Sequence, residues 1–361
     1  MFEYNIILFS ILLGMFGILK NPQKDYTKYY WFVCSILIGI CGLRDEDIGI
    51  DTWGYLVYFL NPHGTQHHYQ TDDNIEPMLG IINNIIHIVV SNKYVYQIII
   101  TSLMLTPVFL YYKKRSDNTF LTLFLYVTFS IAMAPFFLAW AALRQTLACA
   151  FLSIFLILYE KYNRKLTNKW VVLSFFGMFF CHYTSAMVIL LILFDRIRVG
   201  KKALYIITIL STCVGFYMGT YQTHLQYLGI LLFGGEFYFT NISGNSFNVV
   251  SLLPYCFICL YSIYVSDDKR INTIPFKSLI MSFVVMGIMS FWGNNVDRMA
   301  MYFYIPSYLA ITSVLMDKSQ NGFLRFTFFS SILGYFIYKY YTTLDAATEA
   351  GHNFLPYVWC F

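Results

Sequence analysis

Charged side chains are scarce in this sequence. Asp, Glu, Lys and Arg make up 12% of the 361 residues, against about 25% in an average soluble domain. Hydrophobic residues make up 58%, and no stretch is long and polar enough to fold as a separate soluble domain. This composition predicts a single integral membrane domain over residues 1–361. The net charge of +5 matters here through its distribution across the membrane, and we expect no nucleic-acid partner.

Metal and redox patterns are also lacking. The eight cysteines fall mostly inside apolar runs, where a thiol acts as a small apolar side chain. Only Cys256 and Cys259 have a CxxC spacing, within the apolar stretch "LLPYCFICLYS". The first apolar run, residues 2–19, lacks a small-residue cleavage site, so we expect a retained helix. The sequence thus predicts no metal site and no cofactor.

Long apolar runs predict an all-α, polytopic membrane protein with about 10–12 transmembrane helices, since about 20 apolar residues span a ~30 Å hydrocarbon core. Two runs are irregular. Residues 76–90 are short and polar in places, and residues 170–194 are interrupted by "CHYTS". We expect one or both to be broken or re-entrant. The other candidate spans are residues 2–19, 29–43, 94–112, 119–137, 138–158, 204–219, 249–265, 278–292, 299–316 and 322–340.

The basic residues indicate the orientation. Nineteen of the 24 Lys and Arg residues fall in six alternate loops, and positive charge is retained on the cytoplasmic side of short loops. All six loops face the cytoplasm only if the two irregular runs make no net crossing. Residues 44–76 and 220–248 then form loops on the outer face. Five basic residues remain outside: Arg44, Lys93, Arg144, Arg298 and Lys339.

The stretch "LRDEDIGIDTWGY" places one arginine and four carboxylates at the outer end of an apolar run. Asp51 and Tyr55 are four residues apart, so they share a face if a short helix begins here. Asp51 also suits the first turn of that helix. The simpler interpretation is that Asp51 only caps the helix and that Arg44 pairs with a neighbouring carboxylate.

The stretch "AWAALRQTLA" carries Arg144 and Gln145, which we place about two turns into a helix that starts at the outer face. An arginine facing lipid at that depth costs about 2.5–3.5 kcal/mol on insertion scales, so it should face the bundle interior. A guanidinium beside a Gln side chain offers donors suited to phosphate oxygens. The alternative is a structural ion pair.

His182 and Ser185 lie at the interruption "CHYTS". A lone histidine in an apolar segment is more often a hydrogen-bonded core residue than a catalyst. Non-helical backbone at membrane depth, however, is tolerated where it lines a polar cavity. The break therefore favours a position facing water or substrate. Arg298 and Tyr302, one turn apart in "GNNVDRMAMYFYIP", form another candidate pair at headgroup depth, although Asp297 could simply neutralise Arg298.

In this order, these motifs resemble the EpsG-type membrane proteins of bacterial polysaccharide clusters, which include many O-antigen polymerases called Wzy. The resemblance spans about residues 44–303, and Ala141 stands where the family commonly has Asn. The matching positions are Arg44, Asp51 and Tyr55; Glu76 and Pro77; Arg144, Gln145 and Ala148; His182, Ser185 and Ala186; and Arg298 with Tyr302.

The resemblance implies a glycosyltransferase of GT-C-like architecture in the bacterial inner membrane, with its active site facing the periplasm. It would move a growing glycan from undecaprenyl pyrophosphate to the non-reducing end of a new lipid-linked unit. A polysaccharide co-polymerase of the Wzz type is the implied partner. Two other classes stay open: a flippase or transporter of the lipid-linked unit, and a membrane O-acyltransferase that modifies the glycan.

For the polymerase reaction, the predicted roles follow from the charge that develops on the pyrophosphate and from the need for a general base. Asp51 is the first candidate for the base and His182 the second. Tyr55, Glu76 and Ser185 complete the predicted site. The predicted pyrophosphate ligands are Arg44, Arg144, Gln145, Arg298 and Tyr302.

Overall fold

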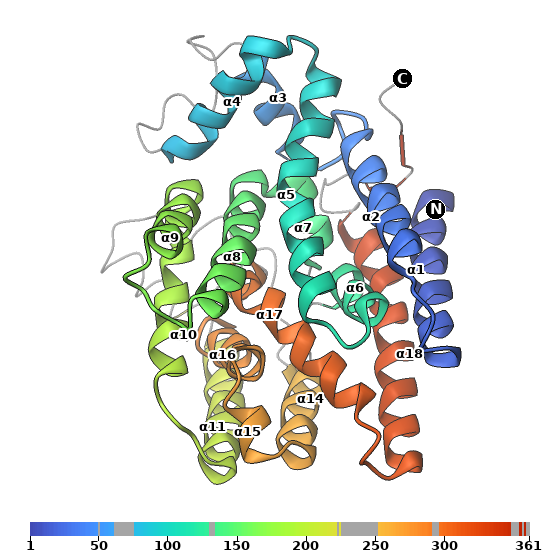
Figure 1. Cartoon of the computed structure of the whole chain (residues 1–361), viewed down its shortest axis with the longest axis vertical. Coiled ribbons are helices and arrows are strands. Elements are labelled where there is room, and N and C mark those ends of the chain that lie inside the picture. Colours follow the sequence, from blue (N-terminus) through green and yellow to red (C-terminus); the bar gives the residue numbers. More distant parts are fainter. Residues whose placement is uncertain are drawn as a thin grey trace. The chain divides into compact units, whose positions relative to one another are not determined.

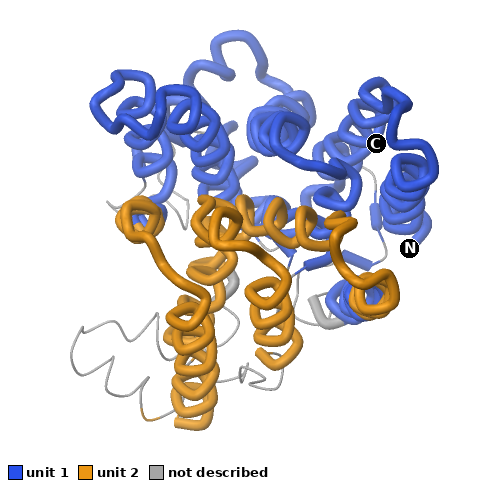
Figure 2. Tube along the Cα trace, turned by 60° about the horizontal axis from the view of Figure 1, so that its bottom comes forward, with its two compact units in different colours: residues 1–129, 133–186, 332–361 blue, residues 130–132, 187–331 orange. Residues whose placement is uncertain are grey.

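The structure is a computed structural model. It describes residues 1–49, 51–60, 76–129, 134–221, 224, 252–290, 296–347, 354–355 and 357–358. Within these ranges the regular structure is helical and contains no β-strand, which confirms the all-α prediction (Figure 1). The chain divides into two compact units, coloured in Figure 2. The first comprises Met1–Phe129, Met133–Ala186 and Ile332–Phe361, and the second Ser130–Ala132 and Met187–Ser331.

The first unit is built around helix α5, which packs against α2, α3, α6 and α8. Asn side chains start three of the helices: Asn92, Asn118 and Asn168 accept backbone N–H groups at the beginnings of α5, α6 and α9, which otherwise lack intrahelical partners. The unit comprises α1 (Phe2–Lys20), α2 (Thr27–Gly42), α3 (Thr52–Leu60), α4 (Pro77–Val89), α5 (Lys93–Arg115), α6 (Thr119–Thr128), α7 (Pro135–Ala141), α8 (Leu143–Lys161), α9 (Lys169–Cys181) and the end of α18 (Gly322–Ala347).

An aromatic cluster joins distant parts of this unit. The rings of Tyr4, Phe137, Trp140, Phe354 and Tyr357 contact one another with centroids 5.3–6.1 Å apart. The Tyr4 hydroxyl donates a 2.6 Å hydrogen bond to the carbonyl of Phe354, so a buried tyrosine is satisfied without a charged partner. The cluster fixes α1 and the last described residues against α7.

The second unit is built around α16 (Ile274–Ile288), which contacts α10 (Val188–Asp195), α11 (Lys201–Thr220), α14 (Leu252–Val265), α15 (Asp268–Ile271) and α17 (Val296–Met316). Small residues let α11 and α16 approach closely, as is common between membrane helices. A Cβ atom on Gly287 would lie 2.4 Å from the carbonyl oxygen of Ser211. The hydroxyl of Ser290 donates to the carbonyl of Gly215 at 3.0 Å.

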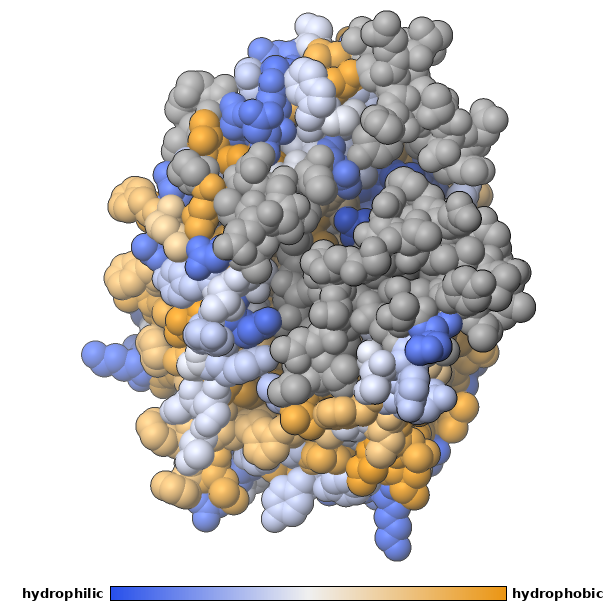
Figure 3. Space-filling model, turned by 180° about the vertical axis from the view of Figure 1, so that it is seen from behind, coloured by the Kyte–Doolittle hydropathy of each residue, from blue (hydrophilic) through white to orange (hydrophobic). Residues whose placement is uncertain are grey.

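The chain is a multi-pass membrane protein. Among the described residues, five helices are long and apolar enough to cross a membrane by length and composition: α1, α5, α8, α11 and residues 298–316 of α17. Seven shorter apolar helices accompany them. Apolar side chains are also exposed on the face shown in Figure 3, and Phe2 and Phe323 are 73% and 76% exposed. Such exposure suits contact with lipid.

The predicted break in residues 170–194 is confirmed. Helix α9 ends at Cys181, His182 is extended (φ −162°, ψ 119°), and a 3₁₀ turn, η1 (Tyr183–Met187), precedes α10. The chain passes from the first unit to the second between Ala186 and Met187, within η1. That the two units form one membrane domain stays a prediction.

Two predicted spans are wrong. Residues 119–137 do not form one helix, because α6 ends at Thr128 and α7 begins at Pro135. Proline has no N–H group and is favoured at the first position of a helix. Residues 138–158 are divided at Ala142, whose backbone is not helical (φ −119°, ψ 63°). Arg144 therefore lies in the first turn of α8, and not two turns into a helix.

Candidate active site

Glu76 is the centre of the candidate site. Its side chain is only 5% exposed. Oε2 lies 2.5 Å from Nη1 of Arg144, and Oε1 lies 2.9 Å from Nδ1 of His182. The backbone nitrogen of Tyr183 lies 3.5 Å from the same Oε1. One buried carboxylate thus links an arginine of α8 to the histidine that follows α9.

The local sequence explains how these groups meet. Pro77 occupies the beginning of α4, so the helix cannot extend back to Glu76, whose backbone is non-helical (φ −58°, ψ 132°). Helix α4 packs against α9, which ends at the extended residue His182. The amide of Ser185 donates to the carbonyl of His182 at 3.0 Å and closes the turn. Two helix ends therefore place Glu76 and His182 side by side.

The electrostatics favour an ionised Glu76. This residue precedes α4 and lies outside the helices long enough to cross a membrane. Burial raises its pKa, but the contact with His182 and the charge of Arg144 outweigh burial and lower the pKa to about 2. Glu76 is therefore a carboxylate at neutral pH, able to orient the imidazole and neutralise part of the arginine charge.

Arg144 lies where an anion is favoured. Helix α8 starts after Ala142 without a side-chain cap, and the first N–H groups of a helix attract negative charge. Arg144 also forms a hydrogen bond with the hydroxyl of Tyr55. Its side chain remains 25% exposed. The adjacent Gln145 is 4% exposed, so a guanidinium, a buried amide and a helix N-terminus coincide.

Two other predicted residues lie in the same unit. Ser185 is fully buried, and its hydroxyl has no hydrogen-bond partner among the residues that the structure describes. Asp51 is half-buried, and its carboxylate forms no hydrogen bond or ion pair with the described part of the chain. Its backbone carbonyl accepts the amide of Tyr55 at 3.2 Å. A capping role for the Asp51 side chain thus finds no support among these residues.

Arg44 has a different environment from the one expected of a pair with a neighbouring carboxylate. It is 4% exposed, and among the described residues its guanidinium contacts no carboxylate; it donates to neutral oxygens of the protein. Glu46 pairs with Lys93 instead. The simpler interpretation of Arg44 is therefore wrong.

Arg298 and Tyr302 belong to α17 of the second unit. Arg298 is half-buried and Tyr302 is fully buried. Their participation in the Glu76 site stays a prediction. Of the predicted outer loop 220–248, the structure describes only Thr220, Tyr221 and His224.

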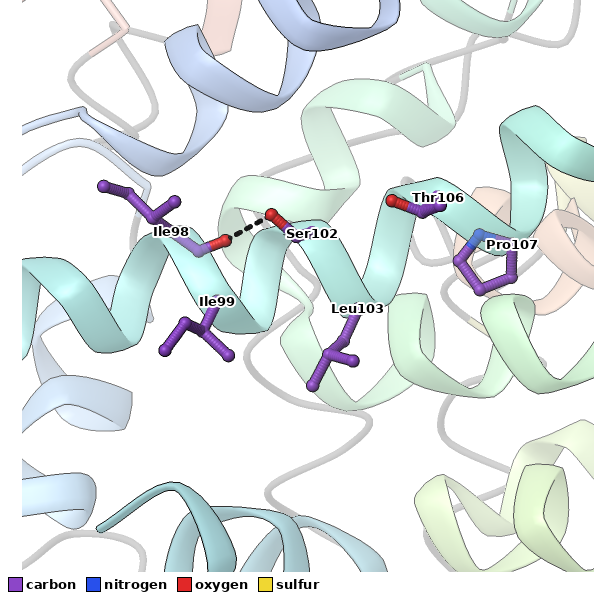
Figure 4. Close-up of a pocket in the computed structure, with 6 residues that line it drawn as sticks. All are labelled: Ile98, Ile99, Ser102, Leu103, Thr106 and Pro107. Carbon is purple, nitrogen blue, oxygen red and sulfur yellow. Dashed lines mark hydrogen bonds between the residues drawn. The ribbon is translucent and has the colours of Figure 1, made fainter. Parts of the chain in front are cut away.

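Two further features bear on binding. Across the residues that are described, no group of three or more His, Cys, Asp and Glu side chains could hold a metal ion. A shallow apolar hollow on one face of α5 is shown in Figure 4. The hydroxyl of Ser102 in this hollow donates to the carbonyl of Ile98 at 2.8 Å, and the hollow includes none of the predicted site residues. Its lining residues are Ile98, Ile99, Ser102, Leu103, Thr106 and Pro107.

In the sequence, Glu76 is marked only by its match to an "EP" motif with Pro77. The structure makes it the residue that joins Arg144 and His182. The sequence contains a signal for this role. Burying a carboxylate directly before a proline, at the start of an apolar helix, costs free energy unless the carboxylate has polar or charged partners.

Comparison with known proteins agrees with these motifs. A family model described as EpsG family matches residues 27–359. The chain belongs to the EpsG family. A search of curated proteins found no match, and a search of solved structures found none. EpsG membership supports a polysaccharide-polymerase type of function in general.

Proposed function

We propose that this EpsG-family protein is a glycan polymerase of the inner membrane. It transfers a growing glycan from undecaprenyl pyrophosphate to the non-reducing end of a new lipid-linked repeat unit, with its active site facing the periplasm. The observation that carries the proposal is the buried Glu76 carboxylate shared by Arg144 and His182. Family membership supports the class of reaction.

The anionic end of the donor is assigned to the start of α8. As the glycosyl bond breaks, negative charge grows on the pyrophosphate, and fixed donors stabilise that charge without having to reorient. Arg144, the amide of Gln145 and the first N–H groups of α8 supply such donors. Glu76 and Tyr55 hold the guanidinium in place. Arg298 and Tyr302, one turn apart in α17, are proposed as further pyrophosphate ligands.

His182 is proposed as the general base. Because Nδ1 faces Glu76, Nε2 is the ring nitrogen left to accept a proton. The acceptor hydroxyl loses its proton to Nε2 while its oxygen bonds to the anomeric carbon of the donor sugar. The bond from that carbon to the pyrophosphate oxygen breaks, and undecaprenyl pyrophosphate leaves with the electron pair. Asp51 is the alternative base, and Ser185, three residues after His182, is proposed to belong to the same site.

Gel electrophoresis of the surface polysaccharide from a deletion strain tests the proposal. Loss of the polymer ladder, with a single repeat unit retained, is the expected result, and the gene supplied in trans should restore the ladder. Loss of every unit would instead identify a flippase. An unchanged ladder with missing acetyl groups would identify an O-acyltransferase. Co-purification with a Wzz-type co-polymerase tests the proposed partner separately.

A further inference from the structure

The guanidinium of Arg44 is fully engaged by the protein. Its Nη2 lies 3.2 Å from both the carbonyl oxygen of Trp140 and Oγ1 of Thr52. Nε donates to the carbonyl of Ile48 at 3.2 Å, and Nη1 contacts the carbonyl oxygen and the sulfur of Cys41. All three nitrogens of the guanidinium, which carry its five N–H groups, thus have acceptors within the protein.

Other contacts tighten the same junction. Oγ1 of Thr52, which carries a single hydrogen, lies 2.7 Å from the carbonyl oxygen of Ile48 and 2.9 Å from that of Trp140. Gly49 has a positive φ of 89°, which favours glycine, and a Cβ there would lie 2.3 Å from the Trp140 oxygen. We name Arg44, Gly49, Thr52 and Trp140 the Arg44 clasp. It holds the segment between α2 and α3 against the end of α7.

The clasp lies next to the residues that hold Arg144. Trp140 precedes Arg144 by four residues, across the joint between α7 and α8. Thr52 is the first residue of α3, and Tyr55, which bonds to Arg144, follows one turn later. One small, partly open cavity is lined by Arg44, Thr52, Tyr55 and Trp140 together. The clasp therefore joins the start of α3, which carries Tyr55, to the end of α7, the helix that directly precedes the helix of Arg144.

We infer that Arg44 is a positioning residue, which acts through the clasp to hold Tyr55 and Arg144 in the orientation that receives the pyrophosphate. It does not contact the substrate. This inference rests on the proposed polymerase function and deepens it. A displacement of about 1 Å at a reacting group can lower a rate by roughly 100-fold, so a clasp of this kind has a measurable kinetic effect.

Thr52 offers the mildest test, because valine keeps its shape and loses the hydroxyl. Full-length protein in lipid vesicles would be assayed with lipid-linked repeat units. We expect Thr52→Val to lower kcat at least about 10-fold and Thr52→Ser to stay within about twofold of wild type. In a Tyr55→Phe background, Thr52→Val should have little further effect, because residues that act through one contact are not additive. A merely structural role would not produce that coupling.

Glycine substitutions supply a matched pair. Gly49→Ala should reproduce the loss of turnover seen with Thr52→Val, whereas Gly39→Ala, where a Cβ meets nothing within 4 Å, should behave as wild type. Binding of farnesyl pyrophosphate is the second measurement. If Arg44→Lys weakens this binding at least about 10-fold while Gly49→Ala and Thr52→Val bind as wild type, Arg44 contacts the pyrophosphate directly and the inference fails.

Additive effects of Thr52→Val and Tyr55→Phe would also overturn the inference. If Arg44→Lys or Gly49→Ala fails to accumulate, the Thr52 series decides the question alone. Failure of the proposed function gives a different result, because the wild-type protein would then form no polymer in the same assay. An active wild type with uncoupled variants refutes the clasp only.

Discussion

Oε1 of Glu76 lies 2.9 Å from Nδ1 of His182, although Glu76 precedes α4 and His182 follows the last residue of α9. A carboxylate beside an imidazole fixes the ring orientation and stabilises the imidazolium that forms when the ring accepts a proton. The second carboxylate oxygen, 2.5 Å from Nη1 of Arg144, ties the same group to the anion-binding side. Glu76 thus connects the proposed proton acceptor to the proposed pyrophosphate ligand.

Glu76→Gln removes this charge and keeps the side-chain size. We expect polymer formation in isolated membranes to fall by about 100- to 10,000-fold, the range in which general acid–base groups contribute. Glu46→Gln is the matched control, since Glu46 pairs with Lys93 at a site where both side chains are 25% exposed. Such pairs contribute about 0–1 kcal/mol. Equal ladders from the two variants would contradict the central role of Glu76.

His182→Asn and Asp51→Asn distinguish the two candidate bases. We expect His182→Asn to leave single-unit glycan at normal protein level, because no imidazole remains to accept the proton. Asp51→Asn should retain a ladder, since the Asp51 carboxylate contacts no described catalytic group. Gel electrophoresis with immunoblotting for protein level checks both. The opposite pattern would assign the base to Asp51.

Arg144→Lys tests the anion site. Lysine keeps the positive charge but loses the planar fork that bonds to Glu76 and a phosphate at once. We expect shortened or absent polymer chains, and an increase of about 10-fold or more in the KM for the lipid-linked donor, corresponding to a loss of roughly 1.4 kcal/mol. Undiminished polymerisation by Arg144→Lys would show that bidentate recognition by Arg144 is not required.

Asp317, which follows α17, predicts a pH dependence of stability. The hydroxyl of Ser319 and then the guanidinium of Arg270 lower the pKa of Asp317 to about 2. Because this pKa is below the usual value of about 3.9 for an unfolded chain, the stabilisation is complete above pH ~4 and is lost as pH falls toward 2. Thermal unfolding in detergent between pH 5 and 2.5 should show a steeper decline for wild type than for Asp317→Asn. Parallel curves would exclude this contribution.

Gly287→Ala should weaken the contact of α11 with α16. The added Cβ would meet the backbone oxygen of Ser211 at 2.4 Å, and overpacking of this kind costs about 1–3 kcal/mol. Gly334→Ala is the control, because a Cβ there meets nothing within 4 Å and alanine favours a helix by up to about 1 kcal/mol. We expect a lower Tm for the first variant only. A Tm unchanged by Gly287→Ala would mean that α11 and α16 can move apart without loss of stability.

The sequence predicted the helical membrane fold because apolar runs and alternating basic loops are local patterns. The break at "CHYTS" was also predictable, since polar residues interrupt an apolar run there. The division of residues 119–137 was missed because the surrounding apolar residues concealed the effect of Pro135. The break at Ala142 was concealed in the same way, so Arg144 was predicted two turns into a helix and not in its first turn.

The sequence alone did not predict which groups the site residues contact. Arg44, Glu76, Arg144 and His182 were each recognisable as costly polar groups in an apolar chain. Which carboxylate meets which arginine depends on helix packing, and local patterns do not encode it. Hence the sequence suggested that Arg44 pairs with a neighbouring carboxylate. In the structure, Glu76 pairs with Arg144, and Arg44 donates hydrogen bonds to neutral oxygens.

The clasp has an electrostatic consequence. Backbone carbonyls accept hydrogen bonds from the Arg44 guanidinium but do not neutralise its positive charge. Among the described residues, no carboxylate pairs with Arg44. A buried charge is weakly screened by salt, so a full positive charge persists behind the α7–α8 joint at any pH at which the protein folds. For an anion that reaches Arg144, this second positive charge offsets the Glu76 carboxylate, although the anion touches Arg144 alone.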